Sequence, residues 1–273
     1  MSIANGQDSL YYSLLWTPKH AYSKAGVKQE GIFLYQFKNG VLKDSFLLQT
    51  KLYDSLGQVT RLDEYRGPRL KTRYHYFYSG SRLDSMVQAE VWLQATIIHR
   101  YAYDANGNLL LDQTFNRHRK TMQTRYVYNS FRQPIQIYTQ IGDGAEWLSA
   151  EFKYRSDKLI QQIDYDFGKA EAADNFSYLY IYSNGTRTNT RYFRRASEEK
   201  RLIDCIRTYN QEGQLIEKIN PPLPKSNWLP AGMHPRNEEE VETSVYLPNG
   251  MLLEVQTKRN NELVRIERRF YVY

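Results

Sequence analysis

A short pattern that recurs about every 26 residues constrains the fold of this chain more than any other feature. Each copy has a tyrosine, a glycine shortly after it, and an apolar residue two positions beyond the glycine. In the clearest copy, RYAYDANGNLLLD at 100–112, these residues are Tyr103, Gly107 and Leu109. A unit of about 26 residues is long enough for two strands of roughly eight residues and two turns. The pattern therefore predicts a chain of repeated β-hairpins.

The tyrosine before each turn serves as the anchor of its repeat. The anchors are Tyr53, Tyr76, Tyr103, Tyr128, Tyr154, Tyr182, Tyr209 and Tyr246. Tyr273 occupies the next anchor position. Seven of the eight intervals between these anchors lie between 23 and 28 residues, which chance does not produce. We expect the anchors to occupy equivalent places and to form a ladder along the sheet, because cross-strand aromatic pairs stabilise sheets.

The residues around the anchors have the period of strands. Tyr101 and Tyr103 share one face, as residues two apart do in a strand. Asn-Gly at 106–107, 184–185 and 249–250 supplies the positive φ that tight hairpin turns need. No stretch keeps a helical period. We predict an all-β fold, an extended antiparallel meander of about nine hairpins and 16 to 18 strands, free to be coiled or partly closed.

The repeat divides the chain into a short leading segment and one long domain. Residues 1–30 are expected to be an N-terminal segment, with a signal-peptide remnant or an ordinary tail at 1–6 and then a lead-in strand. Residues 31–273 form the repeat domain. A proline-rich loop at 220–240 interrupts it, because proline cannot sit in a central strand.

This loop carries the candidate partner-binding residues. Trp228, Leu229 and Met233 are apolar side chains that are costly to leave in water. Long loops without secondary structure are usually functional or disordered. We expect these residues to contact another protein; packing back on the sheet and disorder are the alternatives.

The repeats resemble YD repeats, the units of Rhs-type proteins, across roughly residues 35–273. RYAYDANGNLLLD at 100–112 and KLYDSLGQVTRLD at 51–63 carry the resemblance most clearly. The tryptophan on the return strand, in AEVWLQATIIHRYAYD at 89–104 and DGAEWLSAEFKY at 143–154, resembles the form common in Bacteroidetes surface and envelope proteins. The resemblance implies an extracytoplasmic place, in the periplasm or at the outer membrane. Large Rhs proteins have many more repeats and a C-terminal toxin, so no toxin activity is implied.

The sequence offers no catalytic or metal-binding group. Its five histidines lack close metal-ligand spacing, and Cys205 is expected to be a small buried residue. Asp104, Asn106 and Asn108 are expected to shape their turn, with calcium binding as the alternative. The net charge of +7 and the basic clusters at 116–120 and 191–201 favour a solvated surface over nucleic acid. No apolar stretch is long enough for a transmembrane helix, and no cofactor is expected.

The sequence therefore favours a non-enzymatic structural or interaction subunit of a bacterial outer-membrane-associated complex. A secretion-translocon plug or an accessory subunit would be an example by analogy. A surface glycan-binding module is one alternative, with Trp92 and Trp147 as stacking platforms. An outer-membrane β-barrel is a second alternative, suggested by RFYVY at 269–273, although VTRLDEYRG at 59–67 does not supply lipid-facing apolar residues.

Overall fold

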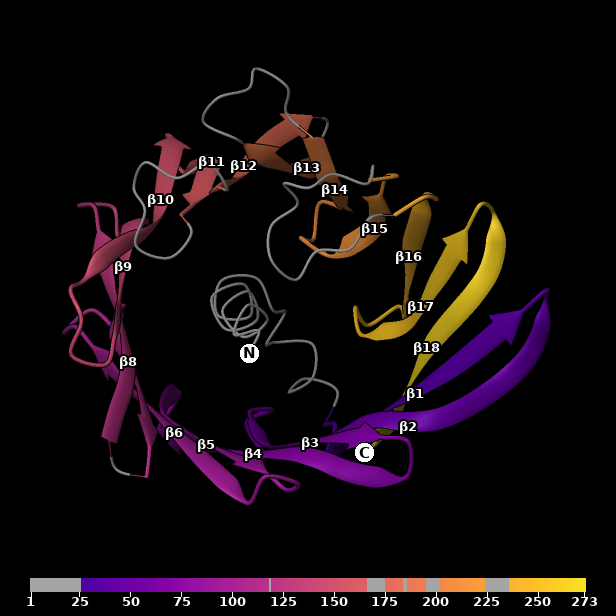
Figure 1. The fold of residues 1–273 in the computed structure, drawn as a ribbon, viewed down its shortest axis with the longest axis horizontal. Coiled ribbons are helices and arrows are strands. Elements are labelled where there is room, and N and C mark those ends of the chain that lie inside the picture. Colours follow the sequence, from indigo (N-terminus) through magenta and orange to yellow (C-terminus); the bar gives the residue numbers. More distant parts are fainter. Residues whose placement is uncertain (1–25, 118, 166–174, 184–185, 195–201, 224–235) are drawn as a thin grey trace.

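The computed structural model describes residues 26–117, 119–165, 175–183, 186–194, 202–223 and 236–273 (Figure 1). These residues form eighteen strands and no helix, and the strands contain more than half of the chain. The strands are β1 (Gln29–Lys38), β2 (Val41–Tyr53), β3 (Val59–Arg66), β4 (Arg69–Ser79), β5 (Arg82–Glu90), β6 (Ala95–Tyr103), β7 (Leu109–Asn116), β8 (Arg119–Tyr128), β9 (Pro134–Ile141), β10 (Trp147–Arg155), β11 (Lys158–Asp164), β12 (Asn175–Ser183), β13 (Thr186–Arg194), β14 (Leu202–Tyr209), β15 (Leu215–Asn220), β16 (Glu240–Tyr246), β17 (Leu252–Arg259) and β18 (Glu262–Val272). The predicted all-β fold of nine hairpins is confirmed.

Each strand pairs antiparallel with its neighbours in the chain, and the order of pairing returns to its start. β1 pairs with β2 and also with β18, in a register that runs from Gln29 opposite Val272 to Gln36 opposite Arg265. Figure 1 shows the resulting ring, with β1 and β2 in indigo beside β18 in yellow. The sequence left coiling or partial closure open; the pairing of β1 with β18 resolves it as a ring of paired strands.

Five of the hairpin turns share one backbone geometry. In four of them a side-chain oxygen accepts the backbone N–H four residues later, and the accepting residues are Asp54, Asp104, Asn129 and Asn210. The fourth residue of each of the five turns has a left-handed φ between 60° and 87°; these are Gly57, Gly107, Arg132, Gly213 and Gly250. Both Asp104 carboxylate oxygens accept hydrogen bonds within this turn, so Asp104 acts there as turn chemistry.

Five tyrosines beside the turns form a ladder through their hydroxyl groups, and three of them, Tyr103, Tyr128 and Tyr246, are predicted anchors. Each hydroxyl donates to a backbone carbonyl of the preceding hairpin, on the residue that faces that hairpin's own anchor. The bonds are Tyr78 to Val59 (3.1 Å), Tyr103 to Leu83 (2.8 Å), Tyr128 to Leu109 (2.9 Å), Tyr246 to Leu215 (2.9 Å) and Tyr271 to Leu252. The ladder thus links neighbouring hairpins through side chains as well as through backbone pairing.

Two anchors lie two residues from the positions that the sequence pattern predicts. Tyr78, and not Tyr76, is the anchor of the β4–β5 hairpin, because this turn is shorter than the others and Tyr78 faces Leu83 directly. Tyr76 instead faces Met86 within the core. At the end of β18 the hydroxyl of Tyr271, and not of Tyr273, makes the ladder bond.

Other contacts are seen at three of the remaining anchors. The Tyr53 hydroxyl donates to Glu30 at 2.6 Å. Tyr154 packs against a small cluster of Ala150, Phe152 and Leu159. The guanidinium of Arg187 lies 4.0 Å from the centre of the Tyr209 ring. The side chain of Tyr182 lies outside the described part.

Most of the core lies on one face of the strands, which we call the tyrosine face because the anchors lie on it. Its largest cluster contains the buried residues Met86, Tyr101, Leu109 and Tyr126, with Tyr74, Tyr76, Tyr103 and Tyr128 packed against them. Threonines, such as Thr124 and Thr139, are buried on the same face. Cys205 is buried, as predicted. The two apolar clusters of the described residues are small and lie on neighbouring strands from β4 to β11.

Candidate functional site: buried ion pairs and an exposed rim

A buried carboxylate joins the strands at which the ring closes. Glu30 on β1 is fully buried, and Lys51 on β2 lies 3.2 Å from its carboxylate. Arg269 on β18 pairs with the same group, and Tyr53 donates a hydrogen bond to it. Burial alone would raise the pKa of Glu30, but Lys51 and Arg269 together hold it below its usual value. This carboxylate is consequently ionised, and its ion pairs join β1 to β2 and to β18.

Asp63 is a second buried carboxylate with two cationic partners. The carboxylate lies 2.6 Å from the Arg61 guanidinium and 2.7 Å from that of Arg73, in the β3–β4 hairpin. Burial raises its pKa, but hydrogen bonds from Arg73 and Arg61 outweigh burial and lower it. The group is therefore charged at neutral pH and already saturated with donors.

Two further buried carboxylates each pair with an arginine. Asp204 pairs with Arg236 at 3.0 Å, and Glu254 pairs with Arg268 at 2.6 Å. A carboxylate that serves as a general acid or base needs access to a substrate proton. These carboxylates are instead held by guanidinium groups, an arrangement typical of structural ion pairs.

The base of the proline-rich loop is part of this arrangement. Leu223 is buried and forms an isolated β-bridge with Arg236. Arg236 also donates to the carbonyls of Pro221 and Asp204, at 3.2 and 2.7 Å. The excursion between β15 and β16 is thus anchored at both ends. Trp228, Leu229 and Met233 lie within 224–235, outside the described residues.

Apolar side chains are exposed at one end of the ring. Because the strands form a meander, alternate turns lie at the same end, and we call the end with the turns 39–40, 67–68 and 91–94 the distal rim. The end with the anchor turns is the anchor rim. On the distal rim Trp92 is 55% exposed and Leu93 75% exposed, next to the exposed Val91. Exposed apolar side chains that adjoin one another typically mark contact sites.

The side chain of Trp92 is held in place although it is exposed. Its indole N–H donates to the Leu70 carbonyl at 3.2 Å, and the Arg69 guanidinium lies 5.8 Å from the ring centre. Both partners are in β4, beside the turn at 67–68. An exposed aromatic group that is already ordered loses little entropy when a partner covers it. Trp147, by contrast, is half-buried, so the two tryptophans are not equivalent.

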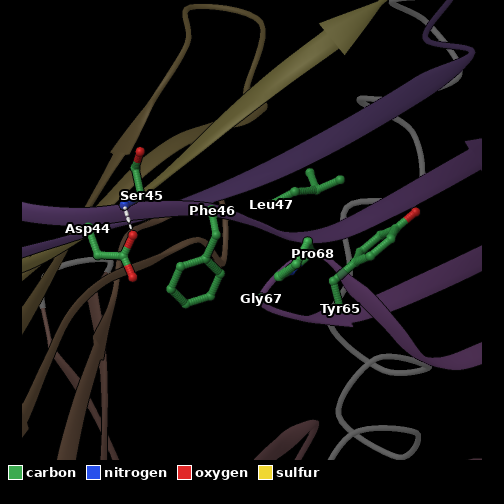
Figure 2. A pocket seen from close by; sticks show the side chains of 7 residues that line it. All are labelled: Asp44, Ser45, Phe46, Leu47, Tyr65, Gly67 and Pro68. Carbon is green, nitrogen blue, oxygen red and sulfur yellow. Dashed lines mark hydrogen bonds between the residues drawn. The ribbon is translucent and has the colours of Figure 1, made fainter. Parts of the chain in front are cut away.

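A pocket of about 430 Å³ lies on the same rim (Figure 2). We call it the rim pocket; it is lined by Asp44, Ser45, Phe46 and Leu47 of β2 and by Tyr65, Gly67 and Pro68 at the β3–β4 turn. Phe46 and Pro68 give it an apolar lining, and Asp44 and Ser45 add polar groups. Sequence reasoning missed this pocket, because it depends on how far β2 extends beyond β3.

Histidine, cysteine and carboxylate side chains do not gather into a metal site. Within the described ranges no group of three or more of them is placed to hold a metal ion. His99 lies 3.4 Å from Asp112 and 3.3 Å from Thr114, which makes it part of a polar network on the tyrosine face. No helix among the described residues is long and apolar enough to cross a membrane.

Comparisons with known proteins give weak structural similarity and no family. The chain matches no protein-family description and no curated protein. A porin-like protein from Bacteroides uniformis aligns over 90% of this chain and 96% of its own, with 10% identity and a TM-score of 0.39. TcdB2-TccC3 without its hypervariable C-terminal region aligns over 86% of this chain and 14% of its own, with 12% identity and a TM-score of 0.31. Similarity at this level carries no argument about fold or function.

Proposed function

We propose that the protein is a non-enzymatic interaction subunit of a bacterial outer-membrane-associated complex. The observation that carries this proposal is the patch of Val91, Trp92 and Leu93, which is exposed on the distal rim. Tryptophan is the type of residue that dominates interface energies, and this one is already held by Leu70 and Arg69. A rigid ring that presents an ordered apolar patch is suited to docking.

The proposed absence of catalysis follows from how the buried charges are used. Glu30, Asp63 and Glu254 each pair with a lysine or arginine on a neighbouring strand, and Asp204 pairs with Arg236 at the base of the proline-rich loop. Burial raises the pKa of Tyr78 and Tyr128 to about 12, so their hydroxyls are neutral donors at physiological pH. These groups support the ring, which is the role that we assign to them.

The envelope setting rests on the resemblance of the repeats to YD repeats of envelope proteins. A plug or accessory subunit of a secretion translocon is the example that this resemblance supplies by analogy. The proposed place is the periplasm or the periplasmic side of the outer membrane. The partner is expected to be another protein of the same complex.

The proposal can be tested by isolating the tagged protein from cross-linked envelope fractions of its native cells. We expect it in the envelope fraction with a reproducible protein partner. The double variant Trp92→Ser and Leu93→Ser should lose most of that partner while keeping its fold. The matched control is Leu56→Ser with Phe131→Ser, which removes apolar groups that are 63% and 80% exposed on the anchor rim. A cytoplasmic location, or equal loss in both double variants, would contradict the proposal.

Glycan binding remains a second candidate, because Trp92 is exposed and ordered as a stacking platform would be. A glycan array distinguishes this function from protein docking. A closed ring of eighteen strands also has the strand number of large membrane barrels. However, Lys71, Arg100 and Lys153 are exposed on the face opposite the tyrosine face. Charged side chains on a lipid-facing surface are strongly destabilising, so this face is poorly suited to contact lipid.

A further inference from the structure

One strand edge of the ring is left open. β2 pairs with β1 from Val41 to Leu52, but β3 pairs with β2 only from Gln49 to Tyr53. Residues 41–48 of β2 therefore have a paired side toward β1 and an unpaired side toward the β3–β4 turn. Unpaired backbone groups along a strand edge are a template for another strand. We call residues 43–48 the open edge.

At the open edge, the backbone N–H of Ser45 is hydrogen-bonded to a neighbouring side chain and not to another strand. The Ser45 N–H donates to the carboxylate of its own neighbour Asp44 at 2.8 Å. Both residues are exposed, so this bond is in contact with water and is weak. An incoming strand can replace it with a backbone carbonyl once the Asp44 side chain rotates away. Asp44 thus acts as a replaceable cap on the edge.

The rim pocket lies directly against the open edge. Four of its lining residues, from Asp44 to Leu47, belong to β2, and the others close it from the β3–β4 side. Alternate side chains of an added strand point to the same face, so one of them can enter a pocket beside the edge. The apolar rings of Phe46 and Pro68 favour an aliphatic or aromatic side chain in that position.

The charges around the open edge are mostly positive. The exposed basic residues here are Lys38, Lys43, Arg66, Arg69 and Lys71. Asp44 is the acidic residue of the pocket lining. Complementary charge speeds association and selects partners, so this surface favours a chain that carries carboxylates.

We propose that the open edge of β2 binds an extended acidic peptide segment as an added strand, with one apolar side chain in the rim pocket. The proposal deepens the proposed function and rests on it, since it names the chemistry of the docking partner. Backbone pairing provides the affinity, the pocket fixes the register, and the basic residues select for acidic sequence.

The first experiment measures binding of a fluorescein-labelled ten-residue peptide of alternating Glu and Val by fluorescence anisotropy. Ser45→Pro removes the exposed amide and should weaken binding roughly tenfold, because one backbone bond is lost and the ring blocks close approach. Lys43→Glu with Arg66→Glu should weaken it by at least as much. The charge control is Arg132→Glu with Lys153→Glu, two exposed residues outside this edge, and it should leave binding within about twofold.

Asp44→Ala gives a change of the opposite sign. It removes the competing acceptor and the unfavourable negative charge, so peptide binding should tighten by roughly threefold to tenfold. If the far-ultraviolet circular dichroism of Ser45→Pro differs from that of the native protein, Ser45→N-methyl-alanine takes its place. This variant is prepared by ligation and also lacks the amide hydrogen.

Several outcomes overturn the proposal. It fails if the Glu-Val peptide does not bind, if a Lys-Val peptide binds as well, or if Ser45→Pro and Asp44→Ala leave binding unchanged. A concentration-dependent dimer that Ser45→Pro abolishes would assign the edge to a second copy of this chain. If the native partner is retained by Ser45→Pro, this inference fails while the proposed function stands; absence of any partner rejects the proposed function itself.

Discussion

Tyr101 and Tyr103 lie two residues apart on the tyrosine face, and loss of their hydroxyls should change stability in opposite directions. The Tyr103 hydroxyl donates to the Leu83 carbonyl at 2.8 Å. The Tyr101 hydroxyl is buried without a hydrogen-bond partner among the described residues. The perturbation is the same in both cases: Tyr→Phe removes one oxygen and keeps the ring.

The two magnitudes follow from the surroundings of each oxygen. A made hydrogen bond contributes about 0.5–1.5 kcal/mol, so Tyr103→Phe should destabilise the fold by about 1 kcal/mol. A buried hydroxyl without a partner costs about 1–3 kcal/mol in proteins, so Tyr101→Phe should stabilise the fold by about 1 kcal/mol. The variants should thus differ by about 2 kcal/mol, or roughly thirtyfold in the folding equilibrium.

Urea titration followed by circular dichroism gives the comparison, supported by hydrogen exchange of the backbone amides in β6 and β7. Tyr128→Phe serves as the matched control, because its hydroxyl donates to the Leu109 carbonyl at 2.9 Å, as Tyr103 does to Leu83. It should behave like Tyr103→Phe. If Tyr101→Phe is as destabilising as these two, the hydroxyl of Tyr101 has a partner and the reasoning is refuted.

Three further changes test other features of the ring. Arg132→Gly should stabilise the fold by about 0.5–1 kcal/mol and so raise the urea midpoint of unfolding. The reason is that Arg132 has a left-handed φ of 60° at a position where the four equivalent turns have glycine. A lower midpoint would show that the backbone of Arg132 is not strained. Asp63→Ala should cost about 1–3 kcal/mol, because the hydrogen bonds of a buried carboxylate are lost while Arg61 and Arg73 stay partly hydrated. Asp143→Ala, at an exposed pair, should cost almost nothing, and equal costs in urea titration contradict this. The pKa of the Glu30 and Glu254 carboxyls is lowered in the folded state, so the unfolded state takes up protons first as the pH falls. Their contribution is therefore present above about pH 5 and lost below about pH 4, and unfolding midpoints that do not fall in that range contradict it.

The individual hairpins could be predicted because each is determined by a short stretch of sequence. The alternation around Tyr101 and Tyr103 and the Asn-Gly turn at 106–107 determine a hairpin without help from the rest of the chain. The assignment of Tyr76 failed because counting back from Gly80 assumes a constant turn length. A one-residue change in a turn shifts which tyrosine faces the return strand.

Features that depend on distant residues could not be predicted. Arg269 and Glu30 are 239 positions apart and pair at the closure of the ring, which no local pattern indicates. The rim pocket depends on where β3 stops pairing with β2, opposite Gln49, and therefore on the relative lengths of two strands. The sequence pattern places Trp92 on a strand, whereas the structure has it in the turn at 91–94. The docking prediction therefore fell on Trp228 in the proline-rich loop instead.

Because β1 pairs with β18, the number of repeats determines the geometry of the whole ring. An open solenoid can gain or lose a repeat at either end while the other repeats keep their contacts. In a ring, one hairpin more or fewer changes the circumference and therefore the curvature of every strand pair. Variation in such a protein is consequently easier in the connections than in the strand count. The long connection between Asn220 and Glu240 joins two strands that pair with each other, so its length does not alter the pairing of β15 with β16.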